Sequence, residues 1–137
     1  MLCHEDILSF EEMRMIVEAA AQLGVKKVRL TGGEPLVRRG IVDLTRMISA
    51  VDGIEEVVMT TNATLLAPLA KDLKAAGLSR LNISLDTLDP KRYAKLSRTG
   101  TLADALAGIA AAREAGFTHT KFNAVLLGGL NEDEIRP

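Results

Sequence analysis

The chain has 137 residues, of which 47% are hydrophobic and 26% charged, and its formal net charge is −1. This composition is typical of a globular domain, and the near-neutral charge argues against a general nucleic-acid or anionic-membrane surface. No apolar run approaches the roughly 18 residues that span a bilayer, and the first residues lack the pattern of a signal peptide. We therefore expect a cytoplasmic protein whose partners include neither nucleic acid nor a membrane.

Helices and strands are expected in alternation along the chain. The first helix is predicted from about Phe10 to Leu23, because Ser9 and Glu12 have the spacing of a capping box and apolar residues follow at helical intervals. Further helices are predicted over 41–50, over 68–76, after Asp89-Pro90, and from Thr101 to Gly116. Strands are predicted over 26–30, 56–60, 80–84 and 121–126. This order predicts an α/β fold with a parallel sheet, as a (βα) barrel or a doubly wound sheet.

The organisation of the chain predicts one domain over residues 1–137, since no linker interrupts the pattern. The chain opens on a helix without a strand before it, and four strands cannot close a barrel. We therefore expect a partial barrel that lacks segments at both ends. Its exposed sheet edges favour self-association.

Side chains alternate in character along every predicted strand. One face is apolar and is expected to lie under the helices; it carries Val28, Leu30, Val57, Met59, Leu81, Ile83, Leu85, Phe122, Ala124 and Leu126. The opposite face is polar and carries Arg29, Thr31, Thr60, Asn62, Asn82, Ser84, Asp86, Lys121 and Asn123. Parallel strands buried on both faces are normally apolar throughout. The pattern thus predicts a wet, ligand-binding cavity at the C-terminal strand ends, with a solvated edge or an internal hydrogen-bond network as the alternative.

Two cations on that polar face, Arg29 and Lys121, suit an anionic ligand such as a phosphate chain. The loop Gly32-Gly33 follows the first predicted strand, where glycine allows close approach of the backbone to a ligand. Glu34 adds a carboxylate that could hold a ligand ammonium. An ordinary tight turn is the alternative, and neither a G-x-G-x-x-G nor a Walker A sequence occurs.

The chain contains one cysteine, Cys3. A single thiol excludes an internal disulfide and cannot hold a metal cluster alone. Cys3 is either a lone ligand or an ordinary residue near the terminus. We predict the second and assign no metal ligand.

Segment 28–36, Val-Arg-Leu-Thr-Gly-Gly-Glu-Pro-Leu, closely resembles the region around the Gly-Gly-Glu motif of radical S-adenosylmethionine (SAM) enzymes. Further matching segments are His4 to Ser9, Thr60-Thr61-Asn62, Asn82 to Asp86 and Lys121 to Val125. Together, and over nearly the whole chain, they resemble the GTP 3',8-cyclases of molybdenum cofactor (molybdopterin) biosynthesis.

The resemblance implies a partial radical SAM (βα) barrel of the TIM type, with about four parallel strands and outer helices. It implies a lyase in which a SAM-derived 5'-deoxyadenosyl radical starts the conversion of GTP to a cyclised pterin precursor. By residue, it implies SAM contacts at Gly33, Glu34 and Ser84, and GTP contacts at Arg29, Thr60 and Lys121. The family holds [4Fe-4S] clusters on cysteines before and after the matching region. Those ligands are absent here, so we assign no catalytic residue and expect no catalysis by this chain alone.

Two single positions and one loop depart from the family pattern. Ala63 stands where glycine is usual, Gly40 stands where an acidic helix cap is usual, and 127–129 differ from the usual loop. Two alternatives to a cyclase fragment are kept. One is a (βα) enzyme or binding module for a phosphorylated metabolite without an iron–sulfur cluster. The other is a structural module that pairs through its sheet edges.

Overall fold

A computed structural model describes residues 8–97 and 99–134 of the chain. Helices and strands alternate as predicted, in the order α1 (Phe10–Gln22), β1 (Lys27–Leu30), α2 (Ile41–Ser49), β2 (Glu56–Thr61), α3 (Ala70–Ala75), β3 (Arg80–Ser84), α4 (Pro90–Leu96), α5 (Leu102–Glu114) and β4 (Lys121–Asn123). Two short 3-10 turns, η2 (Pro35–Val37) and η3 (Glu132–Glu134), complete the set. Cys3 and most of the predicted match at His4 to Ser9 lie outside the described residues.

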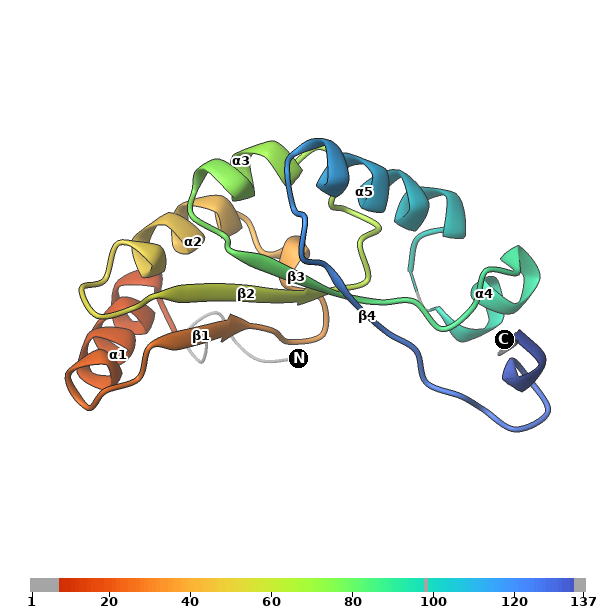
Figure 1. The fold of residues 1–137 in the computed structure, drawn as a ribbon, viewed down its shortest axis with the longest axis horizontal. Helices are drawn as coiled ribbons and strands as arrows, with labels where there is room; N and C mark the ends of the chain where they lie inside the picture. The colour runs from red at the N-terminus through yellow and green to blue at the C-terminus, as the bar shows by residue number, and fades with distance from the viewer. Residues whose placement is uncertain (1–7, 98, 135–137) are drawn as a thin grey trace.

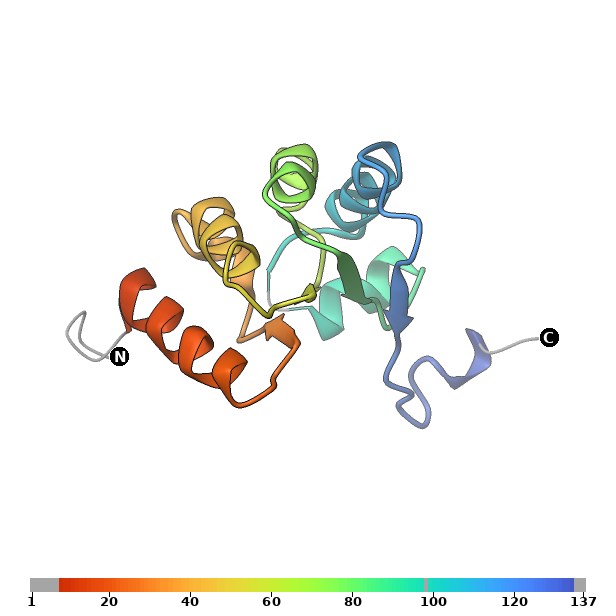
Figure 2. The same ribbon diagram turned by 60° about the vertical axis from the view of Figure 1, so that its left-hand side comes forward.

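The four strands form one parallel sheet in the sequential order β1-β2-β3-β4. A doubly wound sheet reverses its strand order at a switch point, whereas this sheet does not, so the arrangement is that of a partial barrel. In Figure 2 the strands follow an inner arc, with α1, α2, α3 and α5 along its outer side. Helix α4 instead lies near the C-terminal ends of the strands (Figure 1).

Helix starts follow local sequence signals. Ser9 with Glu12 and Thr101 with Asp104 form complete capping boxes for α1 and α5, and the Asp89 side chain caps α4. Gly40 begins α2 with φ 76° and offers no side-chain hydrogen bond, which confirms the weakened cap predicted there. The predicted helix starts at 10, 41 and 90 are thereby confirmed.

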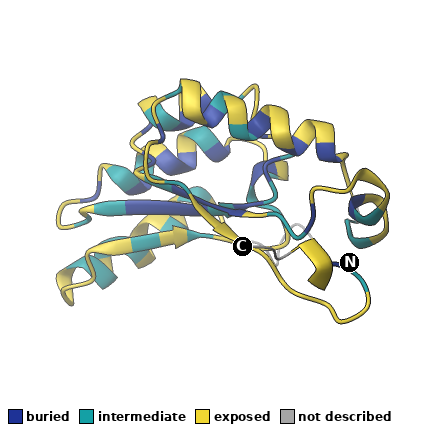
Figure 3. Cartoon of the chain, turned by 45° about the vertical axis from the view of Figure 1, so that its right-hand side comes forward, coloured by how far each residue is buried: buried dark blue, intermediate teal, exposed yellow. Residues whose placement is uncertain are grey.

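The hydrophobic core lies between the sheet and the outer helices. Val57, Met59, Leu81 and Ile83 come from the predicted apolar face and are at most 1% exposed. They pack in one cluster with side chains of the outer helices, among them Leu73 of α3. Burying each large aliphatic side chain contributes roughly 1.5–3 kcal/mol. Figure 3 shows the result, with β2 largely buried and β4 exposed.

The last strand corrects the prediction. A strand was expected over 121–126 with Phe122, Ala124 and Leu126 under helices, but β4 ends at Asn123 and these three side chains are exposed. Beyond Asn123 the backbone leaves the sheet, and Val125 N donates to Asp86 Oδ1 at 2.9 Å. Phe122 is 51% exposed and lines an open cavity together with Ile109 and Arg113 of α5.

Candidate functional site

The sheet face that points away from the helices carries cross-strand rows set by the register. From the N-terminal to the C-terminal strand ends, these rows are Lys27–Glu56, Arg29–Val58–Arg80, Thr60–Asn82–Lys121 and Ser84–Asn123. Every residue in these rows except Val58 is polar or charged. The strand parity predicted this face, and the register now says which of its residues are neighbours.

Charges at the N-terminal end of this face neutralise one another. Glu56 accepts from Lys27 Nζ and from Arg80 Nη2, both at 2.7 Å. The hydrogen bond from Lys27 lowers the pKa of Glu56, and the charge of Arg80 adds to that effect. Among the described residues, Arg29 and Lys121 form neither a hydrogen bond nor an ion pair. The charge of Lys121 is therefore available to an anion, whereas the charge of Arg29 also acts on Glu56 and contributes to lowering its pKa.

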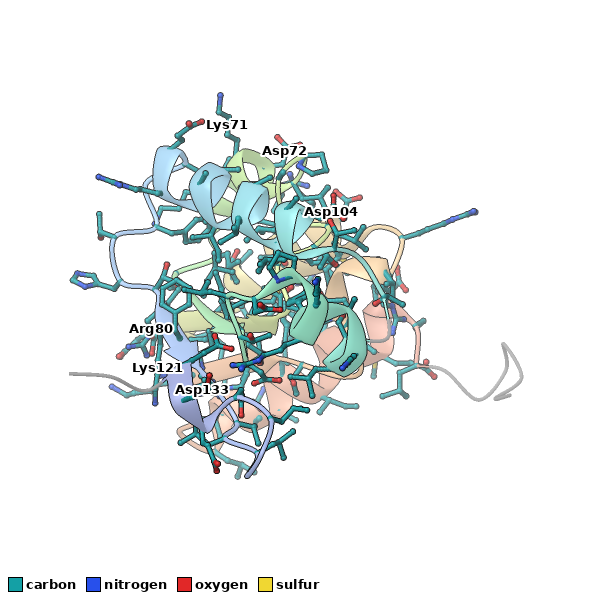
Figure 4. All side chains as sticks on the ribbon, turned by 90° about the vertical axis from the view of Figure 1, so that its right-hand side faces the viewer. Lys71, Asp72, Arg80, Asp104, Lys121 and Asp133 are labelled. Carbon is teal, nitrogen blue, oxygen red and sulfur yellow. The ribbon has the colours of Figure 1, made fainter. Side chains whose placement is uncertain are left out.

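The third row brings two predicted GTP contacts together. Thr60 and Lys121 lie two strands apart, about 10 Å at ordinary strand spacing. Thr60 Oγ1 is shielded from solvent and has no hydrogen-bond partner within the described part of the chain. Arg29 lies farther from Lys121 than Thr60 does. It lies one row nearer the N-terminal strand ends and on β1, at the opposite edge of the sheet from β4. Figure 4 shows Lys121 and Arg80 at the sheet, away from the helix-borne Lys71 and Asp104.

Asn82 is a member of this row that the site prediction omitted. It sits in register between Thr60 and Lys121, and its side chain is 4% exposed. The sequence placed Asn82 on the polar face but could not reveal its neighbours, because cross-strand register depends on how the loops close. Any ligand that spans Thr60 and Lys121 passes over Asn82.

The Gly32-Gly33 loop follows β1 at the same end of the sheet. A Cβ atom added at Gly33 would meet no described atom within 4 Å, and the φ of Gly33 lies outside the left-handed region. The fold of the described residues therefore does not itself require glycine there. Glycine at this position instead leaves space beside the backbone for a molecule outside the chain, such as a ligand.

Ser84 ends β3 and is exposed. It lines a cavity of about 150 Å³ together with Asn62, Asp86, Thr87, Tyr93, Leu96 and Ser97. The cavity lies between the strand ends and α4, so α4 supplies part of its wall. Tyr93 was not expected here, because its place on α4 gives no local signal that it faces a strand end.

The segment after β4 is fastened to the loop that follows β3. The Asn131 side chain is 1% exposed and donates to Asp86 O at 2.6 Å and to Val125 O at 2.9 Å. Glu134 accepts from Leu88 N at 2.8 Å and from Thr87 Oγ1. Both anchors hold the loop that carries Asp86 and Thr87 into the Ser84 cavity.

The Glu34 carboxylate accepts three hydrogen bonds from the chain. Its partners are Leu36 N at 3.1 Å, Thr61 Oγ1 at 2.7 Å and Asn62 N at 2.8 Å. A carboxylate has about four acceptor positions. Glu34 thus joins the glycine loop to the end of β2, and through Asn62 it reaches the Ser84 cavity.

The described residues do not fit an iron–sulfur cluster. Such clusters are held by several cysteine thiolates. Within residues 8–97 and 99–134 no three His, Cys, Asp or Glu side chains gather as a metal site, and Cys3 lies outside that part. No helix in the same part is long and apolar enough to cross a bilayer.

Comparison with known proteins identifies relatives over almost the entire chain. The sequence profile of the radical SAM superfamily matches residues 3–137. GTP 3',8-cyclases from Peptoclostridium acidaminophilum and Pseudomonas entomophila (strain L48) are 50% identical over 132 residues and 54% identical over 134 residues. These alignments cover 96% and 98% of this chain but 41% and 40% of the relatives. The chain thus spans about two fifths of their length.

A solved structure supports the fold alone. Coproporphyrinogen III oxidase from Escherichia coli, described as a radical SAM enzyme, aligns with a TM-score of 0.62 at 19% sequence identity. The alignment covers 80% of this chain and 28% of that chain.

Proposed function

The chain belongs to the radical SAM superfamily, and on that premise we propose that it is the SAM- and GTP-binding part of a GTP 3',8-cyclase of molybdenum cofactor biosynthesis. Identity of about one half to relatives of that name, over nearly the whole chain, supports the choice of reaction. We also propose a cytoplasmic location, since SAM and GTP are cytoplasmic metabolites.

One observation carries the proposal, namely that both predicted ligand sets lie at the same sheet. Gly33 follows β1 and Ser84 ends β3, while Thr60 and Lys121 share a row on the open face of β2 and β4. Two ligands held on neighbouring strands meet at short range, as a reaction between them requires.

Each residue receives a role that its surroundings support. Lys121 and Arg29 hold the phosphates of GTP, because neither cation forms a hydrogen bond or an ion pair within the described residues, and Thr60 adds a hydroxyl contact. The Gly33 backbone approaches SAM, and the Ser84 hydroxyl provides a second SAM contact. When bound and cleaved by one electron from an iron–sulfur cluster, SAM would supply the 5'-deoxyadenosyl radical that starts cyclisation. The described residues do not fit the cluster, so we assign this chain ligand binding and no electron transfer.

A chimeric enzyme tests the proposal. Residues 3–137 replace the homologous segment of the Peptoclostridium acidaminophilum relative, and this protein is called the chimera below. Anaerobic incubation with SAM, GTP and a one-electron reductant such as dithionite should yield 5'-deoxyadenosine and a cyclised GTP product, both measured by mass spectrometry. A folded chimera that binds GTP but not SAM would instead support a phosphorylated-metabolite module and would refute the cyclase assignment.

A further inference from the structure

The loop after β1 and the end of β2 are joined by one carboxylate. Glu34 Oε1 accepts from Thr61 Oγ1 at 2.7 Å and from Leu36 N at 3.1 Å. Glu34 Oε2 accepts from Asn62 N at 2.8 Å. Hydrogen bonds to an ionised acceptor are roughly twice as strong as neutral ones. The bonds from Thr61 and Asn62 therefore hold the two loops together, whereas the bond from Leu36 N is local to the first loop.

The contact continues beyond Glu34 into the loop after β2. The Thr61 hydroxyl gives its one proton to Glu34, so its oxygen is free to accept from Ala63 N at 3.0 Å. Ala63 is fully buried with φ 64°, a conformation that needs support in a non-glycine residue. Asn62 Oδ1 then accepts from Thr64 N at 3.0 Å. Residues 61–64 thus owe their shape to a set of hydrogen bonds, two of which end on Glu34.

The two loops joined in this way adjoin one member of each candidate ligand set. Gly33 directly precedes Glu34, Thr60 directly precedes Thr61, and Asn62 lines the Ser84 cavity. A shift between these loops would change the separation of the SAM contact from the GTP contact. Placement errors of about 1 Å cost a reaction roughly 100-fold in rate.

We propose that Glu34 is a positioning residue, which fixes the SAM-binding loop against the end of β2, and that its carboxylate does not serve chiefly as the ligand of the SAM ammonium group. The ligand named here rests on the proposed function. Both oxygens of the Glu34 carboxylate accept hydrogen bonds. Glutamine cannot replace it, because an amide accepts at only one of its two terminal atoms. In Glu34→Gln, either Asn62 N or the Thr61 hydroxyl loses its acceptor.

Three substitutions in the chimera separate positioning from direct binding. Glu34→Gln alters the carboxylate itself, Thr61→Val removes its main side-chain partner, and Thr61→Ser restores that hydroxyl. The matched control is Thr45→Val, because Thr45 is also fully buried and its hydroxyl donates to Ile41 O within α2. For each variant, circular dichroism verifies the fold, calorimetry measures SAM and GTP affinity, and hydrogen exchange follows the Asn62 and Ala63 amides without ligand.

Positioning predicts that Glu34→Gln and Thr61→Val both weaken SAM binding at least fivefold, and accelerate exchange of these amides at least tenfold. Thr61→Ser and Thr45→Val should keep the SAM affinity of the chimera within twofold. Unchanged SAM affinity in folded Thr61→Val overturns the proposal, whatever Glu34→Gln shows, since Thr61 supports the loop without being the assigned ligand. Failure of the unsubstituted chimera to bind SAM is a different result, which refutes the proposed function itself.

Discussion

Gly108, in the middle of α5, shows how closely the backbone of one element passes another. A Cβ atom at this position would lie 2.1 Å from Ala63 O and 3.1 Å from Leu66 Cβ. The helix therefore packs its backbone directly onto the loop after β2, the same loop that is hydrogen-bonded to Glu34. Glycine inside a helix normally costs about 1 kcal/mol relative to alanine, and here close packing outweighs that cost.

Gly108→Ala should accordingly destabilise the fold, although the same change usually stabilises a helix. We expect a loss of about 1–3 kcal/mol, because the loop cannot move without disturbing buried Ala63. Thermal unfolding followed by circular dichroism measures the effect. Ala107→Gly is the matched control, since Ala107 is exposed on the same helix and should lose only about 1 kcal/mol. An unfolding temperature that rises in Gly108→Ala would contradict this packing.

At the scale of elements, α5 depends on an ionised cap. Asp104 Oδ2 accepts from Thr101 Oγ1 at 2.7 Å and from Thr101 N at 2.9 Å. The hydrogen bond from the hydroxyl, and then that from the backbone, lower the pKa of Asp104. Because the folded pKa lies below the unfolded value of about 3.9, the ionised form stabilises the fold above that pH. This stabilisation is lost as the pH falls through the folded pKa.

Asp104→Asn should therefore lower the unfolding temperature at pH 7, and the gap to the unsubstituted chain should narrow as the pH falls below about 4. Thermal melts at several pH values measure this gap. Asp72→Asn is the control, since Asp72 lies in the first turn of α3 and makes no cap hydrogen bond there. A gap for Asp104→Asn that stays constant with pH would show that the charge has no part in the cap.

Local signals predicted most elements but few of their mutual contacts. The capping residues Ser9, Asp89 and Thr101 place three helix starts, and strand parity separates the core face from the polar face. The predicted end of β4 was wrong. The alternation of polar and apolar side chains is visible in the sequence, whereas the pairing of an edge strand depends on which segment lies beside it. The hydrogen bonds of Glu34 and the position of Asn82 also escaped, because both follow from loop closure between strands far apart in sequence.

At the scale of the whole molecule, the described sheet is open at β1 and β4. Beyond the backbone edges, it exposes apolar side chains around β4, where Phe122 is 51%, Val125 60% and Leu126 53% accessible to solvent. Unpaired strand edges and contiguous apolar surface both promote association.

The isolated chain should therefore self-associate at micromolar concentration, as measured by light scattering coupled to size exclusion. Phe122→Ser should reduce the associated fraction. The control Leu106→Ser changes a residue that is 43% exposed on the outer helix α5 and should have little effect. A stable monomer with a cooperative melt would mean that the edges are protected in solution.

We propose that the open face of this sheet binds GTP next to SAM. The sharpest test is calorimetric titration of GTP into the chimera carrying Lys121→Ala. The matched control is Lys71→Ala, which removes one cation from the surface of α3. A lost charged contact costs about 1.5–3 kcal/mol, so the binding free energy of GTP should weaken by that amount while SAM affinity is unchanged. Unaltered GTP affinity in Lys121→Ala, or a loss confined to SAM, would contradict the assignment of this face.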